Sequence, residues 1–574
     1  RSAATYVAKL RGERVGETVG YRVRMESKVS RATRLEVVTD GLLVRRIQDD
    51  PELSGIGLLV FDEYHERSLT ADLALALALD VQAALRPDLR LLLMSATPDA
   101  RAARWLQAPV IRSEGRTFPV DTRRLLPGDV PPDVRTPLDR LERLVPQAVR
   151  RALDETDGDV LAFLPGVREI ERVRERLMGL SNVDVLPLHG SLSLSDQDAA
   201  LAPSSGSRRK VVVASAIAET SLTLPGIRAV VDGGFARVPR YDAGAGRTSL
   251  ATVMHSRASA EQRAGRAGRV APGVCYQLWT SAEHDRRPAQ QSPEMQHADL
   301  APLALELAAW GAGAGDLRWL DPPPHRTLEA AYELLRGLGA VDSGHRVTPH
   351  GRALVRLGLH PRLGHLLLRG AELGHARAAS DLAAVLSERD LLRGSGGPPP
   401  PDARLRLDAL AGKNVPGPPP SRGAIHRTKQ LARDLLRRID STADRPGSAP
   451  VGLLVALAFP DRIGQPEGTN QWGDVRVRLA SGQRARLDKG SPLADADFIA
   501  AATLQGEGDQ LRIALAAPLS SAELEAHFAD QIATDDHLAY DSDADRVVAQ
   551  SRRALGALVL SSKPVRPDSA RAGA

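Results

Sequence analysis

The chain has 574 residues, of which 43% are hydrophobic and 26% are charged. A single domain usually has about 100–200 residues, so this length predicts about three to five domains. The ordinary balance of apolar and charged residues excludes a chain that is disordered throughout. The net charge of +5 is compatible with a polyanionic partner but is too small, over so long a chain, to establish one.

Three features of the sequence bear on where the protein works. No uncharged apolar stretch reaches about 18 residues, which excludes a transmembrane helix. The only cysteine, Cys275, excludes internal disulfides and multi-cysteine metal sites, as expected in a reducing compartment. The chain begins with Arg1, and no secretory signal follows it. We therefore expect a soluble, cytoplasmic protein and a chain that is a fragment of a longer one.

The first half of the chain has alternating α/β character. Apolar runs at Ile56–Phe61 and Leu89–Met94 are typical of buried parallel strands, and Leu69–Leu85 between them predicts a helix. A second α/β unit is predicted from about residue 116 onwards. Its strand-like runs are Asp159–Leu164, Lys210–Ala214 and Ala229–Val231.

The second half of the chain has a different pattern. Leu/Ala/Arg-rich helices are predicted after about residue 300, including Thr327–Leu338 and Arg352–Leu373. Glycine- and proline-rich stretches at Gly394–Pro401 and Pro416–Pro420 predict exposed loops. From Asp474 to Leu487, apolar and basic residues alternate around a Ser-Gly turn. This alternation predicts a β-hairpin of a small barrel with one basic face.

Acidic residues follow the first predicted strand. Asp62-Glu63-Tyr64-His65 stands where an open parallel sheet places its ligands. There Asp62 can hold Mg²⁺ through water, and Glu63 can orient or deprotonate an attacking water. A polar strand cap with a solvated acidic turn explains the tetrapeptide equally well when it is taken alone.

Two further patterns accompany this acidic turn. Ser95-Ala96-Thr97 follows the next strand and offers two hydroxyls at the same sheet edge, although such a triplet alone more often caps a helix. Gln262–Arg269 places Arg263, Arg266 and Arg269 at intervals of three, which predicts that they lie along one side of a helix. Guanidinium groups arranged in this way match phosphate oxygens. A basic surface helix is the competing interpretation.

These motifs, in this order, resemble those of the DEAH-box branch of superfamily-two helicases. Asp62–His65 is similar to motif II, Ser95–Thr97 to motif III and Gln262–Arg269 to motif VI. Further segments resemble motif Ib, motif V and the end of motif Ia. These are Thr39–Gly41, Ser215–Thr223 and Arg1–Ala4.

The resemblance extends over nearly the whole chain. The Glu66-Arg67 continuation of motif II, Leu386–Gly394 and Ala458–Ile463 are similar to the bacterial HrpB group within that family. The resemblance implies an α/β fold with tandem RecA-like parallel-sheet domains, followed by winged-helix, helical-bundle and OB-like domains. The implied boundaries are 1–115 and 116–300 for the RecA-like domains, 301–370 for the winged helix, 371–445 for the bundle, 446–510 for the barrel and 511–574 for a C-terminal segment.

The same resemblance implies a site for ATP and Mg²⁺. Asp62, with Glu63, would hold the metal, and Glu63 would act on the hydrolytic water. Gln262, Arg266 and Arg269 would contact the terminal phosphate. His65 would couple motif II to motif VI, and Ser95 and Thr97 would link hydrolysis to domain movement.

A nucleic-acid path is implied as well. Its contacts with the backbone would be independent of base sequence and sensitive to salt. The residues implied are Thr39, Asp40, Gly41, Thr220 and Thr223.

The sequence departs from the family pattern in three places. The phosphate-binding loop Gly-x-x-x-x-Gly-Lys-Ser/Thr is absent and is expected upstream of Arg1, because the only Gly-Lys pair, Gly412-Lys413, lacks the rest of the motif. Ser215-Ala216 stands where relatives have Thr-Asn. The chain also ends where relatives continue, so we expect truncation at both ends.

The predicted function is a monomeric ATP-dependent helicase that translocates on and unwinds nucleic acid. RNA is the favoured substrate, with 3′ to 5′ polarity implied by the resemblance. The alternative is a fragment that binds nucleic acid without hydrolysing ATP, because the phosphate-binding loop is missing. Cys275 is interpreted as a small buried residue, and His189 as either a structural residue or a neighbour of nucleic acid.

Overall fold

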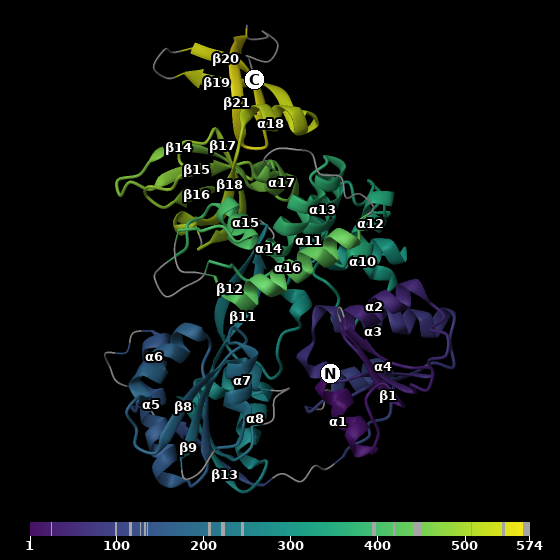
Figure 1. The fold of residues 1–574 in the computed structure, drawn as a ribbon, viewed down its shortest axis with the longest axis vertical. Helices are drawn as coiled ribbons and strands as arrows, with labels where there is room; N and C mark the ends of the chain where they lie inside the picture. Colours follow the sequence, from purple (N-terminus) through teal and green to yellow (C-terminus); the bar gives the residue numbers. More distant parts are fainter. Residues whose placement is uncertain are drawn as a thin grey trace. The chain divides into compact units, whose positions relative to one another are not determined.

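The structure, a computed structural model, describes most of the chain. The chain folds into two compact units (Figure 1). Unit 1 comprises residues 1–240, 250–298 and 314–323, and unit 2 comprises residues 241–249, 299–313 and 324–574. The described residues are 1–23, 26–97, 100–113, 118–126, 128–130, 134, 136–204, 208–219, 224–242, 246–392, 398–416, 420–439, 449–506, 508–541 and 546–565.

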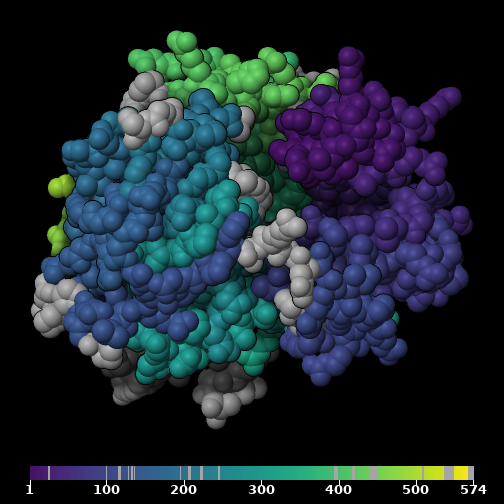
Figure 2. Space-filling view, turned by 90° about the horizontal axis from the view of Figure 1, so that it is seen from below, coloured from purple at the N-terminus to yellow at the C-terminus, as the bar shows by residue number. Residues whose placement is uncertain are grey.

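The first lobe of unit 1, residues 1–113, is drawn purple in Figures 1 and 2. It contains a three-stranded sheet of order β2-β1-β3 and a parallel pair, β4-β5. The predicted strands and the helix between them are confirmed as β4 (Leu58–Phe61), β5 (Arg90–Leu93) and α3 (Leu69–Ala84). The remaining elements are α1 (Ser2–Leu10), β1 (Val19–Val23), β2 (Glu26–Lys28), β3 (Leu35–Val38), α2 (Asp40–Asp49) and α4 (Ala100–Leu106).

The prediction that these strands are buried on both faces is wrong for β4 and for β5, in which no residue is buried and Leu92 is 39% exposed. Leu59 and Phe61 are buried, whereas Leu58 and Val60 are 51% and 45% exposed. Successive side chains of a strand point to opposite faces of the sheet. One apolar face of the β4-β5 pair is therefore left without a covering layer among the described residues.

The second lobe of unit 1, residues 118–240 and 250–298, is built on a six-stranded parallel sheet of order β6-β13-β10-β7-β9-β8. The three predicted strands are confirmed as β7 (Asp159–Phe163), β9 (Arg209–Ala214) and β10 (Ile227–Asp232). The unpredicted strands are β6 (Val120–Leu125), β8 (Val183–Leu188) and β13 (Gly273–Thr280).

Helices cover both faces of this sheet, as is typical of parallel sheets. Helices α5 (Pro137–Glu155) and α6 (Val167–Leu177) pack on one face, and α7 (Leu194–Leu201) and α8 (Arg257–Gly265) pack on the other (Figure 1). Cys275 lies buried in the second of these layers, as predicted for a small structural residue. The two-stranded sheet of β11 (Phe235–Asp242) and β12 (Arg247–Met254) precedes α8, and the short helix α9 (Ser281–Asp285) follows β13.

Unit 2 is helical first and β-rich afterwards, as predicted. Its helices are α10 (Ala301–Trp310), α11 (His325–Gly337), α12 (Pro349–Leu357), α13 (Pro361–Glu372), α14 (Ala376–Ser387), α15 (Ala403–Ala411), α16 (Arg422–Arg437) and α17 (Val451–Ala458). The predicted helix Arg352–Leu373 is in fact two helices. It breaks because Gly358 adopts a left-handed φ of 60° and Pro361 starts the next helix.

A closed five-stranded barrel follows α17, in the order β14-β15-β16-β18-β17. The predicted hairpin is confirmed as β15 (Val475–Leu479) and β16 (Arg484–Leu487). The other strands are β14 (Ile463–Thr469), β17 (Phe498–Gln505) and β18 (Arg512–Leu519). Helix α18 (Ser521–His527) leads to an antiparallel sheet of β19 (Ile532–Asp541), β20 (Arg546–Leu555) and β21 (Leu558–Val565).

These features confirm the predicted fold class, an α/β chain with a RecA-like parallel-sheet core followed by helical and barrel regions. None of the helices in the described ranges is long and apolar enough to cross a membrane.

Helix α17 holds the helical part of unit 2 against the barrel. Every one of its residues is buried, and it packs on β17 and β18. Gly452 lies so close to β18 that a Cβ there would stand 1.8 Å from the backbone carbonyl oxygen of Pro518. The packing therefore requires a residue without a side chain at this position.

We predict that Gly452→Ala destabilises unit 2, because the added methyl must displace a strand backbone. Overpacking of this kind costs about 1–3 kcal/mol or more. The matched control is Gly337→Ala at the end of α11, where a Cβ would meet no atom within 4 Å. Urea denaturation should show a lower midpoint for Gly452→Ala and an unchanged or higher midpoint for Gly337→Ala. Equal midpoints would contradict the close packing of α17 on β18.

Candidate functional site

The loop after β4 carries the predicted acidic pair at the carboxyl end of the sheet. The Met94 amide donates to the carbonyl of Phe61 at 2.8 Å, and the Tyr64 amide donates to the carbonyl of Met94 at 2.9 Å. These bonds continue the β4-β5 pairing into the loop. Glu63 adopts a φ of 50°, which is uncommon for a residue with a side chain. Its amide donates to the Asp62 carboxylate at 2.9 Å.

A buried ion-pair cluster anchors this loop. The Arg67 guanidinium donates to both carboxylate oxygens of Asp72 at 3.0 and 3.1 Å and to Asp321 at 2.7 Å. The hydroxyl of Tyr64 donates to Asp72 at 2.8 Å. Burial raises the pKa of Tyr64, and the charge of Asp72 raises it further. The loop is thereby held to α3 and to the segment that contains Asp321.

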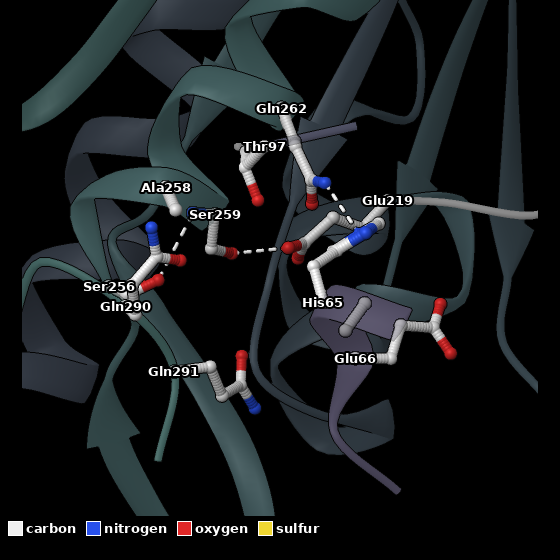
Figure 3. A pocket seen from close by; sticks show the side chains of 11 residues that line it. His65, Glu66, Thr97, Glu219, Ser256, Ala258, Ser259, Gln262, Gln290 and Gln291 are labelled. Atoms are coloured by element: carbon white, nitrogen blue, oxygen red, sulfur yellow. Dashed lines mark hydrogen bonds between the residues drawn. The ribbon is translucent and has the colours of Figure 1, made fainter. Parts of the chain in front are cut away.

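The structure brings motifs II and VI together at one contact. His65 Nε2 lies 2.6 Å from Nε2 of Gln262, which belongs to α8 (Figure 3). The other ring nitrogen of His65, Nδ1, lies 3.5 Å from the Glu63 carboxylate. His65 therefore connects the acidic loop of the first lobe with the glutamine of the second.

A cavity of about 250 Å³ opens beside this contact. Among the predicted site residues, His65, Thr97 and Gln262 line it. The lining also includes Glu66, Ala216, Glu219, Ser256, Ala258, Ser259, Gln290 and Gln291. Figure 3 shows the His65 and Gln262 side chains pointing toward each other, whereas the Glu66 carboxylate points away from them.

The Ser95–Thr97 turn lies next to the acidic loop. The hydroxyl of Ser95 donates to the carbonyl of Thr97 at 2.5 Å, and the Thr97 amide lies 3.2 Å from the Ser95 hydroxyl oxygen. Only Thr97 of the two reaches the cavity. The turn is therefore closed on itself and presents one hydroxyl side chain to the cavity.

The three motif VI arginines do not lie along one helical side, so that prediction is wrong. Helix α8 ends at Gly265, and Arg266–Gly268 forms a short 3-10 turn. Arg263 points into the protein and is 1% exposed, whereas Arg269 is exposed at the surface. The change of helix type alters the angle between successive residues, which separates Arg263 from the other two.

The two remaining arginines lie where they experience the charge of the acidic loop. Arg266 donates to the backbone carbonyl of Glu219 at 2.9 Å. Burial lowers the pKa of Arg266 to about 10, and the neighbouring charge of Arg269 adds to this effect. Partial desolvation of its guanidinium also lowers the pKa of Arg269, and the carboxylate of Glu63 opposes the shift for both arginines. Both groups remain cations at neutral pH.

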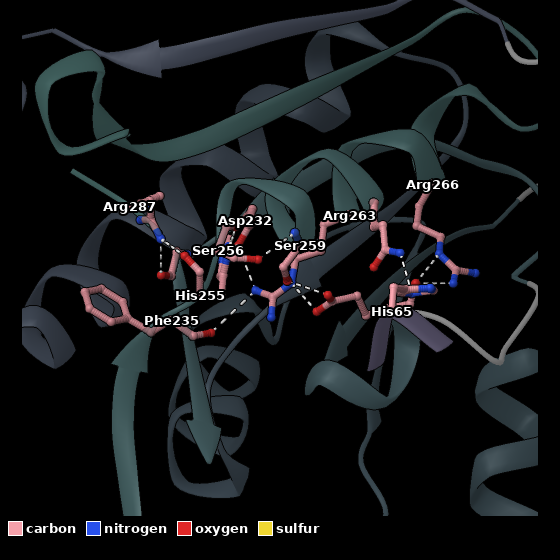
Figure 4. A network of polar contacts seen from close by, with 12 residues as sticks. His65, Asp232, Phe235, His255, Ser256, Ser259, Arg263, Arg266 and Arg287 are labelled. Carbon is pink, nitrogen blue, oxygen red and sulfur yellow. Dashed lines mark hydrogen bonds and ion pairs between the residues drawn. The ribbon is translucent and has the colours of Figure 1, made fainter. Parts of the chain in front are cut away.

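Arg263 belongs to a buried polar network that the sequence did not indicate. Its guanidinium donates to Glu219 at 2.8 Å and to Asp232 at 3.0 Å (Figure 4). Asp232 is fully buried and also accepts bonds from His255 and from the Gly234 amide. Burial opposes ionisation, but His255 and Arg263 outweigh it and hold the pKa of Asp232 below its ordinary value.

Glu219 links this network to the cavity. Its carboxylate accepts bonds from Ser259 and Arg263, and its backbone carbonyl accepts from Arg266. Its position in the Ser215–Thr223 segment, which resembles motif V, was the available signal for it. Asp232 and Asp321 had no such signal, because their partners are distant in sequence.

The predicted nucleic-acid residues are only partly described. Thr39, Asp40 and Gly41 are exposed at the start of α2, and Asp40 accepts a bond at 3.1 Å from Ser68, which follows motif II. Thr220 and Thr223 lie outside the described residues.

The acidic loop suits a hard cation only in part. No group of three or more His, Cys, Asp or Glu side chains in the described part of the chain could hold a metal alone. Asp62 is exposed at the strand end with Glu63 next to it. One or two carboxylates, completed by water and phosphate oxygens, are what Mg²⁺ uses in nucleotide sites. The loop therefore fits Mg²⁺ that arrives with a nucleotide.

Comparisons with known proteins agree with this architecture. The family model described as "Helicase conserved C-terminal domain" matches residues 139–271, and "ATP-dependent RNA helicase HrpB, connector region" matches residues 531–565. The chain is 40% identical over 573 residues to ATP-dependent RNA helicase HrpB of Escherichia coli, covering 98% of this chain and 67% of that protein. It is 35% identical over 400 residues to ATP-dependent RNA helicase HrpA of the same organism, covering 68% of this chain and 30% of that one.

A solved structure extends the comparison to the fold. The crystal structure of E. coli DExH-box NTPase HrpB superposes with a TM-score of 0.84 at 39% identity. The match covers all of this chain and 68% of that one.

We predict that Asp232→Asn destabilises unit 1 by about 3–5 kcal/mol, because it leaves the buried Arg263 with one carboxylate instead of two. The ionised Asp232 carboxylate contributes to the free energy of unfolding at neutral pH, and this contribution is lost as the pH falls below about 3.9. The free energy of unfolding of the variant should therefore decrease less steeply in acid. Denaturation curves at several pH values measure both effects. The control is Asp121→Asn, because Asp121 is exposed and pairs with the exposed Arg123, and its loss should cost less than about 1 kcal/mol. A similar cost for both variants would refute the role of Asp232.

Proposed function

We propose, from the premise that the chain belongs to the HrpB family of DEAH-box helicases, that it hydrolyses ATP to translocate on RNA and to unwind it. The observation that carries this proposal is the contact of His65 with Gln262 at 2.6 Å. It joins the acidic loop after β4 to the glutamine of α8 beside one cavity. Relatives matched over most of this chain are named ATP-dependent RNA helicases, which supports an enzyme over the alternative of a non-hydrolysing binding fragment.

The residues of the acidic loop after β4 can divide the steps of hydrolysis among them. Mg²⁺ bound with ATP neutralises phosphate charge and orients the terminal phosphate. Asp62 would hold that ion with Glu63 beside it. Glu63 would accept a proton from the water that attacks the terminal phosphorus while ADP leaves. His65, whose Nδ1 lies 3.5 Å from the Glu63 carboxylate, would help to orient that carboxylate.

The cations of motif VI would stabilise the charge that develops on the phosphate. Arg266 and Arg269 both experience the charge of the Glu63 carboxylate, which supports a role for them near the proposed water site. Guanidinium groups held at such a position stabilise a transferring phosphoryl group. Gln262 would contact the same phosphate, and its contact with His65 would couple phosphate binding to the acidic loop.

The family pattern also supports a domain organisation for the chain. We propose RecA-like domains at 1–115 and 116–300, a winged helix at 301–370, a helical bundle at 371–445, an OB-like barrel at 446–510 and a C-terminal segment at 511–574. Thr39, Asp40 and Gly41, with Thr220 and Thr223, would contact the RNA backbone. Ser95 and Thr97 would couple hydrolysis to movement of a monomeric protein along the strand.

We predict that Glu63→Gln lowers RNA-stimulated ATP hydrolysis by at least about 100-fold, because the general base is lost. The 574 residues contain no Gly-x-x-x-x-Gly-Lys-Ser/Thr motif, so the assay uses the full product of the reading frame that encodes them. Phosphate release is measured with and without single-stranded RNA. The control is Glu17→Gln, which should leave hydrolysis unchanged. Glu17 is exposed and lies in the loop that precedes β1. Full activity of Glu63→Gln, or no hydrolysis by the unmodified protein, would refute the proposal.

A double-mutant cycle tests the contact that carries the proposal. His65→Ala and Gln262→Ala should each lower kcat by about tenfold, because each removes the same polar contact. The double variant should be little worse than either single variant, since the two side chains act through one another. Additive losses in kcat would show that His65 and Gln262 work independently.

A further inference from the structure

The barrel of unit 2 displays a large aromatic side chain in solvent. Trp472 stands in the turn between β14 and β15 and is 71% exposed. A tryptophan carries a large apolar surface, which normally finds a partner within the protein or on a ligand. β14, β15 and β16 are drawn green in Figure 1.

The turn holds Trp472 in a defined position. The side-chain oxygen of Asn470 accepts bonds from the amides of Trp472 at 3.0 Å and Asp474 at 2.9 Å. The Asn470 amide donates to the carbonyl of Asp474 at 2.8 Å. Gly473 supplies the left-handed φ of 84° that the turn requires. The indole is thus presented on a preorganised support.

Two cations belong to the turn that carries Trp472 or lie next to it. The aliphatic stem of Lys489 packs against Gly473, with Cδ 3.0 Å from where a Cβ would stand, and the Lys489 amide donates to Asp474 at 3.1 Å. Arg476 lies two residues after Asp474 and is exposed. Neither Lys489 nor Arg476 forms an ion pair with any residue that the structure describes. Their charges are available to an anionic ligand.

The strands that follow extend this basic surface. Arg476 stands directly opposite Arg486, and Arg478 stands directly opposite Arg484, in the β15-β16 register. Like charges at such positions destabilise a sheet. Carboxylates offset part of the repulsion, with Asp474 2.8 Å from Arg486 and Glu467 3.6 Å from both Arg478 and Arg484. An anionic ligand on this face would relieve the rest.

We propose that Trp472 stacks on a nucleobase of single-stranded nucleic acid, while Lys489, Arg476 and the arginine pairs of β15 and β16 bind its phosphates. An aromatic platform next to a cationic groove is the arrangement that binds single strands without sequence preference. In five-stranded barrels of this type, the second and third strands and the first loop form the surface that holds oligonucleotides. The identity of the strand as RNA rests on the proposed function, whereas the stacking site does not.

The test measures binding of the 574-residue chain to a labelled oligouridine of about 20 nucleotides without ATP. Trp472→Ala should weaken binding by about 5- to 150-fold, the range for loss of one stacked base. Trp472→Phe should restore most of the affinity. The fluorescence of Trp472, taken as the difference between the unmodified chain and Trp472→Phe, should be quenched by the oligonucleotide. The control, Tyr6→Ala, removes an equally exposed aromatic side chain from α1 (63% exposed) and should leave binding unchanged.

Salt dependence separates stacking from charge. The double variant Arg476→Gln and Lys489→Gln should reduce the slope of log affinity against log salt by about 1.4, because each phosphate contact with a single strand contributes about 0.7. Trp472→Ala should leave that slope unchanged. Duplex RNA should be insensitive to Trp472→Ala, because its bases are already stacked.

Other outcomes overturn the proposal. Unchanged affinity and no quenching would remove Trp472 from the binding surface. Displacement of the oligonucleotide from this site by polyglutamate at equal charge concentration would instead indicate an acidic protein partner. The outcome is independent of catalysis, because the binding assay contains no ATP. Trp472-dependent binding without any ATP hydrolysis would refute the proposed function and leave this site intact.

Discussion

The candidate site of the second lobe depends on one buried cation, the guanidinium of Arg263. A buried charge costs several kcal/mol unless opposite charges and hydrogen bonds compensate for it. Here Asp232 at the end of β10 and Glu219 supply two carboxylates, and the ring of Phe163 lies 4.8 Å below the guanidinium. Because these groups come from different elements, pairing them with Arg263 fixes α8 against the end of the sheet.

The pairing of Arg263 with Glu219 determines which hydrogen-bond acceptor is left for Arg266. Since the Glu219 carboxylate is engaged by Arg263 and Ser259, Arg266 bonds to its backbone carbonyl instead. A neutral carbonyl orients Arg266 without cancelling its charge. Arg269, one turn further, has no ion pair within the described part of the chain. The network thus orients Arg266 next to Arg269, and both cations experience the charge of the acidic loop.

Sequence patterns predicted the elements well and their long-range pairing poorly. The runs that became β4, β5, β7, β9 and β10 were found because apolar runs are local signals. The Arg263 prediction failed because it extended the period of an α-helix beyond Gly265, where the chain tightens into a 3-10 turn. The Arg67–Asp321 pair could not be predicted, since 254 positions separate its partners and no periodicity spans them.

Some arginines of this chain are buried and others are exposed. In the barrel, the strand register determines that the arginines are exposed. Val475 and Val477 point into the barrel, so the intervening Arg476 and the following Arg478 point outward. A slip of one residue would exchange the two faces and bury those arginines without carboxylates. The apolar core of the barrel therefore enforces the basic outer face, even though its opposed arginines repel one another. Arg263 is buried because two carboxylates compensate for its charge. The β15 arginines are exposed because the barrel core next to them is filled with apolar side chains.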